Sequence, residues 1–215
     1  MLIGSAKRGL VWPTVEPQVV PITPSLIRGA AQAIADGFFD NEIWVWTLRR
    51  DWQRRRVLPR YYRAMIRHVF EPRGAAWTTA DTTGGALWIP PGMSALRTRE
   101  RIAEFLSLLP EGVPALSRGT RIEELMVAHR PREPHWYLST LSVEPGSQGR
   151  GIGSALMEPG IALVDADRMG AYLETQRRAN VPFYRRFGFE ETGEIKLADS
   201  PPLWKMWRPP LASGS

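Results

Sequence analysis

Apolar and polar residues along the chain follow two different periods, and the change between them predicts a layered fold. Runs of apolar, aromatic and β-branched residues predict strands at 18–22, 75–80, 86–89, 135–143 and 171–175. Apolar positions at helical spacing predict helices at 24–38, 51–70, 97–109 and 114–127, and another after residue 151. Strands and helices that alternate in this way indicate an α/β fold, and hairpins at both ends of the chain indicate a mixed sheet.

Proline and glycine mark three of these boundaries. Pro24 follows Thr23 at the expected start of the first helix, where a fixed φ and a missing N–H are tolerated. The run at 81–85, which ends in two glycines, is the expected turn of a hairpin. Pro59 lies inside the expected helix at 51–70, and we expect it to bend or break that helix.

Residues 141–156 carry the clearest chemical signal. They read Leu-Ser-Val-Glu-Pro-Gly-Ser-Gln-Gly-Arg-Gly-Ile-Gly-Ser-Ala-Leu, an apolar strand that turns into a glycine-dense helix start. Gly149, Gly151 and Gly153 lack a Cβ at places where backbone amides approach an anion closely. The first N–H groups of a helix have no partner within it, and the helix dipole favours negative charge there. This glycine loop, residues 148–154, therefore predicts a pyrophosphate site.

The spacing of the glycine loop selects among phosphate ligands. A nucleoside triphosphate loop ends in Gly-Lys-Ser/Thr, and the only lysines of the chain are Lys7, Lys196 and Lys205. A dinucleotide loop needs Gly-x-Gly-x-x-Gly, which differs from the spacing found. Gln-x-x-Gly-x-Gly after Leu-x-Val instead resembles the acetyl-CoA loop of the N-acetyltransferase superfamily known as GNAT.

A second segment, at the distance usual in that superfamily, strengthens the resemblance. Residues 171–189 are expected to form strand, helix and strand, and Asn180 and Tyr184 fall where members typically carry Asn and Tyr. The stretches at 128–138, 159–160, 173–175 and 204–207 further resemble the C-terminal half of puromycin N-acetyltransferase and its bacterial relatives. The likeness covers roughly residues 122–208, whereas the first 120 residues match only in layout.

The resemblance implies a fold and a domain organisation. The GNAT fold is an α/β architecture with a central, mixed, mostly antiparallel twisted sheet of about six to seven strands flanked by helices. We expect a flexible leader at 1–16, a single acetyltransferase domain at 17–210 and a tail at 211–215. A cytoplasmic protein is expected, because the chain has no cysteine for disulfides and no apolar stretch that would span a membrane. Dimers are common in this superfamily, so a homodimer is an expected alternative to the monomer.

The resemblance also implies which residues bind acetyl-CoA. These are Leu141, Ser142, Val143, Gln148, Gly149, Arg150, Gly151, Ile152, Gly153, Ser154, Asn180 and Tyr184. Backbone amides from Gly149 to Ser154 would take the pyrophosphate, and the amides of 141–143 would pair with the peptide-like pantetheine arm. A backbone N–H near Leu141 would polarise the thioester carbonyl. Tyr184 would protonate the leaving thiolate, unless it only packs beside Phe183 and Phe187. Asn180 has an alternative role as a helix cap.

Several residues could act as the general base that removes the proton from the amine. Glu174, in the strand before Tyr184, is the leading choice, and its alternative role is a strand-end carboxylate paired with an arginine. The other candidates are Glu133, His135, Asp40 and Glu42. For His129 and His135, a hydrogen bond to the backbone before a strand is the plainer interpretation. The three histidines lack the His-Glu-x-x-His spacing, so no metal is expected.

The first half of the chain, which usually builds the acceptor pocket in this superfamily, is rich in tryptophan. It contains Trp44, Trp46, Trp52, Trp77 and Trp88. Most are expected in the core, but flat side chains there would also bind an aromatic amine. The preferred function is acetylation of a small-molecule amine. The alternatives are acetylation of a peptide N-terminus or lysine, and a regulatory protein that binds acyl-CoA without turnover.

The charge balance is basic, with a net charge of +6 and a pI near 10.1. Only three of the 28 basic residues are lysines, which indicates genomic base composition rather than adaptation to nucleic acid. The densest run, 49–56, is interpreted as the solvated face of an amphipathic helix, with an anionic partner surface as the alternative. Neither a nucleic acid nor a membrane is expected as a partner.

Overall fold

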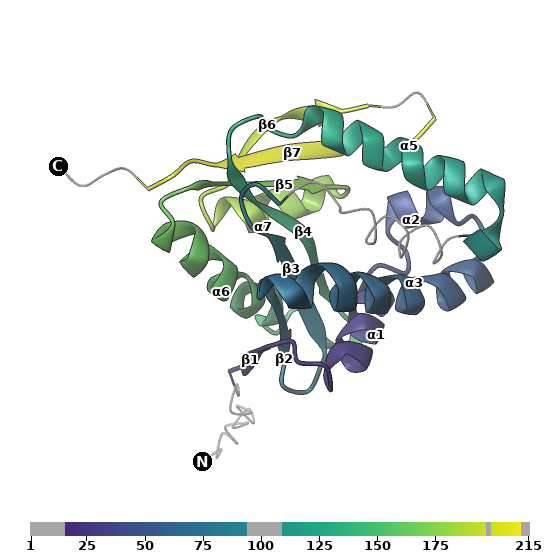
Figure 1. Ribbon diagram of the computed structural model, residues 1–215, viewed down its shortest axis with the longest axis horizontal. Helices are drawn as coiled ribbons and strands as arrows, with labels where there is room; N and C mark the ends of the chain where they lie inside the picture. The colour runs from purple at the N-terminus through teal and green to yellow at the C-terminus, as the bar shows by residue number, and fades with distance from the viewer. Residues whose placement is uncertain (1–15, 94–108, 197–198, 212–215) are drawn as a thin grey trace, which may run out of the picture.

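The structure is a computed structural model that describes residues 16–93, 109–196 and 199–211 (Figure 1). Its centre is a seven-stranded sheet in the order β1-β2-β3-β4-β5-β7-β6. The strands are β1 (Val19–Pro21), β2 (Ala76–Thr79), β3 (Gly84–Ile89), β4 (His135–Val143), β5 (Gly170–Thr175), β6 (Glu190–Ile195) and β7 (Leu203–Arg208). Among these described strands only β4 and β5 run parallel, which confirms a mixed, mostly antiparallel sheet.

Helices cover both faces of this sheet. They are α1 (Ile27–Gly37), α2 (Glu42–Thr47), α3 (Asp51–Met65) with a π-helical continuation (Ile66–Phe70), α5 (Val113–His129), α6 (Ile152–Ala166) and α7 (Val181–Arg185). Figure 1 shows α1 and α3 on one side of the sheet and α6 on the other, while α5 extends from α2 towards β6. Within the described part of the chain, no helix combines the length and apolarity that crossing a bilayer requires.

The alternation of side chains along the strands divides the apolar core between the two faces. Leu87 and Trp88 are neighbours on β3, and both are fully buried. Leu87 belongs to the core that α1 and α3 cover, with Ile34 and Leu58, whereas Trp88 packs with Leu156 under α6. Each face therefore has its own helix layer, as the predicted α/β layering requires.

Two helix boundaries differ from the predictions. α1 begins at Ile27 rather than at Pro24, because the residues between them form a turn. α3 continues through Pro59 without a break and becomes π-helical only at Ile66. The helix predicted at 97–109 lies outside the described residues except for its last position, and the leader predicted at 1–16 lies outside them except for Glu16.

α2 is an element that the hydrophobic pattern did not predict. Asn41 caps it, because the Asn41 side chain accepts hydrogen bonds from the amides of Ile43 (3.0 Å) and Trp44 (3.3 Å). The same side chain donates to Gln176 just beyond β5 at 3.1 Å, which ties the start of α2 to the sheet. An Asn followed by the acidic Glu42 was the signal available in the sequence.

β3 begins at Gly84, inside the run that was predicted to be only a turn. A Cβ on Gly84 would lie 2.7 Å from the carbonyl oxygen of Ser142, and a Cβ on Gly85 would lie 2.7 Å from Cδ1 of Ile34. The two glycines therefore allow β4 and α1 to approach β3 closely rather than reverse the chain.

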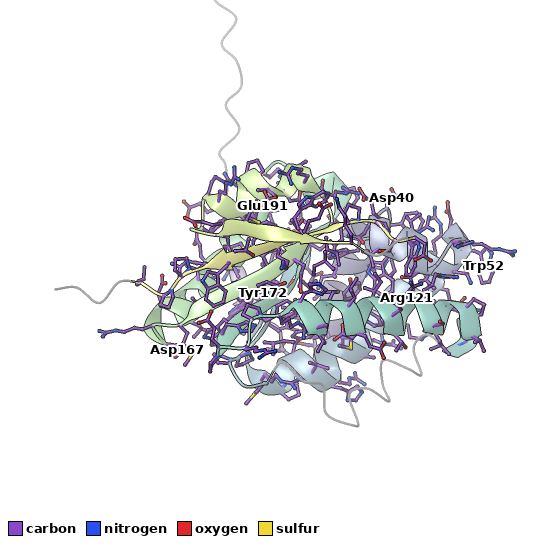
Figure 2. The ribbon with its side chains drawn as sticks, turned by 90° about the horizontal axis from the view of Figure 1, so that it is seen from above. Asp40, Trp52, Arg121, Asp167, Tyr172 and Glu191 are labelled. Atoms are coloured by element: carbon purple, nitrogen blue, oxygen red, sulfur yellow. The ribbon has the colours of Figure 1, made fainter. Side chains whose placement is uncertain are left out.

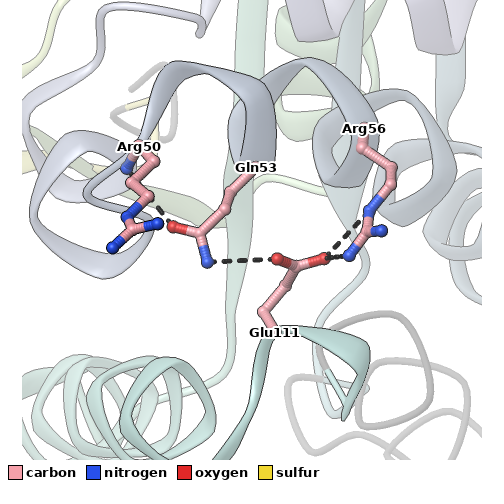
Figure 3. A network of polar contacts seen from close by, with 4 residues as sticks. All are labelled: Arg50, Gln53, Arg56 and Glu111. Carbon is pink, nitrogen blue, oxygen red and sulfur yellow. Dashed lines mark hydrogen bonds and ion pairs between the residues drawn. The ribbon is translucent and has the colours of Figure 1, made fainter.

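A buried carboxylate holds the segment before α5 against α3 (Figure 3). Glu111, whose side chain is fully buried, accepts hydrogen bonds from Nε2 of Gln53 (3.1 Å) and Nε of Arg56 (3.2 Å). Further along α5, Arg118 donates to the carbonyl oxygen of Thr47 at the end of α2 at 2.8 Å. These contacts fix α5 against α2 and α3.

Replacing Gly160 by alanine should destabilise the fold. A Cβ at this position of α6 would overlap the fully buried indole of Trp88, and we expect a loss of about 1–3 kcal/mol in the free energy of unfolding. Thermal or denaturant unfolding measures this loss. The matched control is Gly146→Ala, because no atom lies within 4 Å of a Cβ there. Equal stability of the two variants would contradict the packing described between α6 and β3.

Candidate functional site

β4 and β5 separate partway along their length. They pair only from His135 to Tyr137 on β4, opposite Gly170 to Tyr172 on β5. Ser139 is an extra residue relative to β3, because Leu87 pairs with Thr140 and Trp88 with Leu138, and such a bulge bends a strand. Beyond it, the edge of β4 that faces β5 has no strand partner among the described residues.

A cavity of about 700 Å³ occupies the space between the separated strands. Residues of β4, β5, α2, α5 and α7 line it, together with the glycine loop. Eleven of the predicted acetyl-CoA residues line it: Leu141, Ser142, Val143, Gln148, Gly149, Gly151, Ile152, Gly153, Ser154, Asn180 and Tyr184. The twelfth, Arg150, is exposed and does not line the cavity. The structure therefore brings together residues that are far apart in the sequence.

The glycine loop has the local geometry of an anion site. Gly149 and Gly151 have φ values of 76° and 83°, which favour glycine, and no atom lies within 4 Å of a Cβ at either position. The amides from Gly149 to Gly153 make no backbone hydrogen bond to another described residue, whereas the Ser154 amide donates to the Gly151 carbonyl oxygen at 3.0 Å. The amides from Gly149 to Gly153 therefore fit a pyrophosphate group. The amide of Ser154, which was also predicted to bind it, is already used within the protein.

Two predicted residues, Asn180 just before α7 and Tyr184 near its end, also line the cavity. Tyr184 is buried, and its ring packs against Phe183 at a centroid distance of 5.1 Å and against Phe189 at 6.3 Å. Burial raises the pKa of Tyr184, so the phenol stays protonated at neutral pH. Asn180 makes no capping hydrogen bond, and its amide donates to Oγ1 of Thr175 at 3.4 Å. Asn180 therefore stands at the N-cap position of α7 without the side-chain hydrogen bond of a helix cap.

Glu174 is the most unusual polar group of the cavity. Its residue is only half-buried, but both carboxylate oxygens are buried and have no hydrogen-bond partner among the described residues. Burial raises the pKa of Glu174 to about 7, although the charge of Arg130 and the nearby hydroxyls of Tyr137 and Tyr172 lower it. A carboxylate of this pKa can accept and release a proton near neutral pH.

Arg130 and Glu123 accompany Glu174 in the cavity wall, and the sequence analysis singled out neither. The guanidinium of Arg130 lies 4.1 Å from the centroid of the Tyr137 ring and 3.8 Å from a carboxylate oxygen of Glu123. Burial disfavours the charge of Arg130, but Tyr137 and Glu174 raise its pKa, and it stays a cation. Arg130 lies in the stretch 128–138 that resembles puromycin N-acetyltransferase, whereas Glu123 lies within the range of the likeness but in none of its quoted stretches.

The other candidate bases do not reach the cavity. Nδ1 of His135 lies 2.7 Å from the Glu133 carbonyl oxygen, and Nδ1 of His129 lies 2.8 Å from the Leu125 carbonyl oxygen. These are the backbone hydrogen bonds that the plainer interpretation described. Asp40, Glu42 and Glu133 also lie outside the cavity wall. Within the described residues, no group of three or more His, Asp or Glu side chains is placed to hold a metal ion.

Aromatic side chains line the cavity, but few of them are the tryptophans of the first half, and the expected place of most tryptophans in the core is confirmed for Trp77 and Trp88. Six rings line the cavity beside the predicted Tyr184 and its neighbour Phe183: Phe38, Trp44, Tyr61, Tyr62, Phe70 and Tyr137. Trp44 is the only tryptophan among the described lining residues. Trp77 and Trp88 are buried in the core under α6, and Trp52 is 52% exposed at the outer end of the molecule (Figure 2).

The arginine run at 49–56 is only partly a solvated face. Arg54 is buried, and it donates to the Leu48 carbonyl oxygen at 2.7 Å and to Asp51 at 2.6 Å. Near the glycine loop the structure places another cation, Arg186, 3.4 Å from Oγ of Ser154. This arginine was not predicted as a site residue.

Comparison with known proteins identifies the domain. Residues 115–191 match the family model of the acetyltransferase (GNAT) domain. An uncharacterized N-acetyltransferase of Schizosaccharomyces pombe is 27% identical over 194 residues, which are 79% of this chain and 73% of that protein.

Two solved structures share the fold. One, described as histone acetyltransferase HPA2 and related acetyltransferase from Corynebacterium glutamicum, has a TM-score of 0.67 and 23% identity, and the match covers 93% of this chain and 99% of that one. Arylalkylamine N-acetyltransferase 2 from Aedes aegypti has a TM-score of 0.59 and 13% identity, with 90% and 98% covered. With the matched domain containing the glycine loop, Glu174 and Tyr184, the chain carries a GNAT acetyltransferase domain and is an acetyl-CoA-dependent N-acetyltransferase.

Proposed function

We propose that the protein transfers the acetyl group of acetyl-CoA to the amine of a small molecule that binds at the Glu174 end of the cavity. The observation that carries the proposal is the continuity of one cavity between an anion-binding loop and a buried carboxylate that lacks a hydrogen-bond partner among the described residues. An amine supplies the N–H donors that such a carboxylate requires.

The glycine loop and the open edge of β4 fit the two halves of acetyl-CoA. The amides from Gly149 to Gly153 would bind pyrophosphate oxygens, and Arg186 adds positive charge beside them. The edge of β4 from Leu141 to Val143 would pair with the pantetheine arm as an added strand does. When bound, acetyl-CoA supplies the acyl group, whose bond to sulfur breaks as a bond to the amine nitrogen forms.

Three groups of this chain would share the remaining chemistry. Glu174 takes a proton from the ammonium group, because its pKa near 7 lets a carboxylate persist in the cavity at neutral pH. The backbone N–H of Leu141 stabilises the negative charge that develops on the acyl oxygen. Tyr184, which stays protonated because burial raises its pKa, donates a proton to the departing sulfur.

The resemblance to puromycin N-acetyltransferase supports a small-molecule acceptor, since that enzyme acts on an antibiotic. The fold is also shared with a protein described as an arylalkylamine N-acetyltransferase. A protein or peptide acceptor is the rival within the same reaction, because another structure of this fold is described as a histone acetyltransferase.

Thiol release from acetyl-CoA in the presence of an amine panel tests the proposed reaction. We expect at least one small amine to be acetylated, and we expect Tyr184→Phe to lower kcat by roughly 100-fold, because the proton donor is lost. CoA affinity, measured by calorimetry, controls for an intact cofactor site in this variant. Turnover with peptides but with none of the small amines would overturn the choice of acceptor.

Gly151→Asp should abolish CoA binding. The aspartate would strain a backbone with a φ of 83° and place negative charge beside the phosphates, and we expect affinity to fall by at least about 100-fold. The charge-matched control is Gly146→Asp in the preceding turn, which is exposed and outside the cavity wall. If calorimetry gave the same CoA affinity for both variants, the glycine loop would not be the pyrophosphate site.

The activity should fall as the pH drops below about 7. Glu174 accepts a proton only as a carboxylate, so kcat/KM should decrease about tenfold per pH unit below its pKa of about 7. Glu174→Gln should lower kcat/KM by about 100-fold or more and remove this part of the profile. A wild-type profile that stays flat down to pH 5.5 would exclude Glu174 as the base.

The same carboxyl group should make stability depend on pH in the opposite direction. Its folded pKa is raised from 4.5 to about 7, so the folded state binds the proton more tightly than the unfolded state. The free energy of unfolding of the wild type should therefore fall by roughly 3 kcal/mol between pH 4.5 and 7, relative to Glu174→Gln. Melting temperatures of both proteins across this range measure the difference, and parallel curves would contradict the raised pKa.

A further inference from the structure

Six rings line the cavity that Glu174 also lines, and we call them the aromatic chamber. The rings are Phe38, Trp44, Tyr61, Tyr62, Phe70 and Tyr137. Trp44 meets Tyr61 edge to face at a centroid distance of 5.0 Å, and Phe38 stacks on Tyr62 at 5.7 Å. The indole Nε1 of Trp44 donates to the Tyr62 hydroxyl at 3.0 Å, so these rings hold one another in place. A fixed surface of this kind favours a flat apolar ligand.

A cluster of charged side chains lies beside the Tyr137 ring of the chamber. Glu174, Glu123 and Arg130 lie together there, so two carboxylates face a single guanidinium. When Glu174 is ionised, the local balance is one negative charge. The chamber therefore attracts a ligand with one positive charge.

Each positive charge that lines the cavity has neighbours of its own within the protein. Arg130 lies over the Tyr137 ring and beside Glu123. Arg177, beyond the end of β5, donates to the Asp40 carbonyl oxygen at 3.0 Å, and Arg186 lies beside the glycine loop. A carboxylate on the acceptor would meet Glu174 and Glu123 without a dedicated cation.

We infer that the acceptor is a flat, monocationic amine without a carboxylate, whose ring lies in the aromatic chamber and whose ammonium group meets Glu174. This inference rests on the proposed function and specifies its substrate class. Glu174 is the independent support, because it lines the same cavity as the rings and its two buried oxygens lack a hydrogen-bond partner among the described residues. An ammonium group donates to such oxygens and is attracted to ring faces as well.

Four amines and one peptide, each with acetyl-CoA, test the inference. The probes are 2-phenylethylamine, n-hexylamine, L-phenylalanine, L-phenylalaninol and a short peptide with one lysine and a blocked N-terminus. We expect kcat/KM for 2-phenylethylamine to exceed that for n-hexylamine by about tenfold, because only the former has a ring. L-Phenylalanine should be at least about 100-fold poorer than L-phenylalaninol, which has the same ring and similar bulk but no carboxylate.

Variants assign each preference to its residues. Trp44→Leu should bring the ratio between 2-phenylethylamine and n-hexylamine close to one, whereas Trp52→Leu should leave it unchanged, because Trp52 is exposed and outside the cavity. Glu123→Gln should improve L-phenylalanine relative to L-phenylalaninol by roughly two- to fivefold, because Arg130 loses its carboxylate neighbour. An unchanged ratio in Glu123→Gln would overturn the charge argument.

Direct binding separates this inference from the proposed reaction. Calorimetry without acetyl-CoA should show 2-phenylethylamine binding about tenfold more tightly than n-hexylamine. If that difference in affinity were found but no amine were acetylated, the proposed acetyl transfer would be wrong and the inferred class of ligand would be supported. If n-hexylamine, L-phenylalanine or the lysine peptide were acetylated as well as 2-phenylethylamine, the ligand class would be wrong while the transfer stood.

Discussion

The separation of β4 from β5 after Tyr137 is the constraint on which the site depends. Parallel strands satisfy one another's backbone groups, so ending the pairing early leaves an open edge inside the sheet. The extra residue at Ser139 bends β4 at this point. The opening places the glycine loop, which follows β4, and Glu174, which lies near the end of β5, on the wall of one cavity. The contacts of Asn41 and Arg118 then fix α2 and α5, which line the same cavity.

The opening between β4 and β5 has a cost in folding free energy, because it leaves polar groups of the cavity wall without partners until a ligand binds. Both oxygens of Glu174 are buried without a hydrogen-bond partner among the described residues, and burying such a group costs on the order of 1–3 kcal/mol. Arg130, Tyr137 and Tyr172 offset part of that cost, because each lowers the pKa of the carboxyl group. A group that is under-satisfied in the isolated protein and faces a cavity marks a place where bound ligand supplies the missing donors.

The sequence predicts what is local and misses what tertiary contact creates. The glycine loop was predictable because the requirement for positive φ at Gly149 and Gly151 is local. The same reasoning misplaced Gly84, where glycine serves the close approach of β4 rather than a turn. Phe38, Tyr61 and Tyr137 come to line one cavity only in the folded chain, so their periodicity alone indicated core. Trp88 packs in the core under α6, where most of the tryptophans were expected, so their number in the sequence did not single out the rings that line the cavity.

The residues proposed to carry out the reaction and the residues proposed to select the amine come from different parts of the chain. Residues 115–191, which match the acetyltransferase domain, contain the glycine loop, Glu174 and Tyr184, together with Glu123 and Arg130. All but one of the chamber rings come from elements before residue 115, namely α2, α3 and the segments that flank them. Because the matched part supplies the groups proposed to handle protons, its family identifies the reaction. Most of the rings come from outside residues 115–191, so membership of the family does not identify the amine. The shape and charge of the chamber would determine which amine binds.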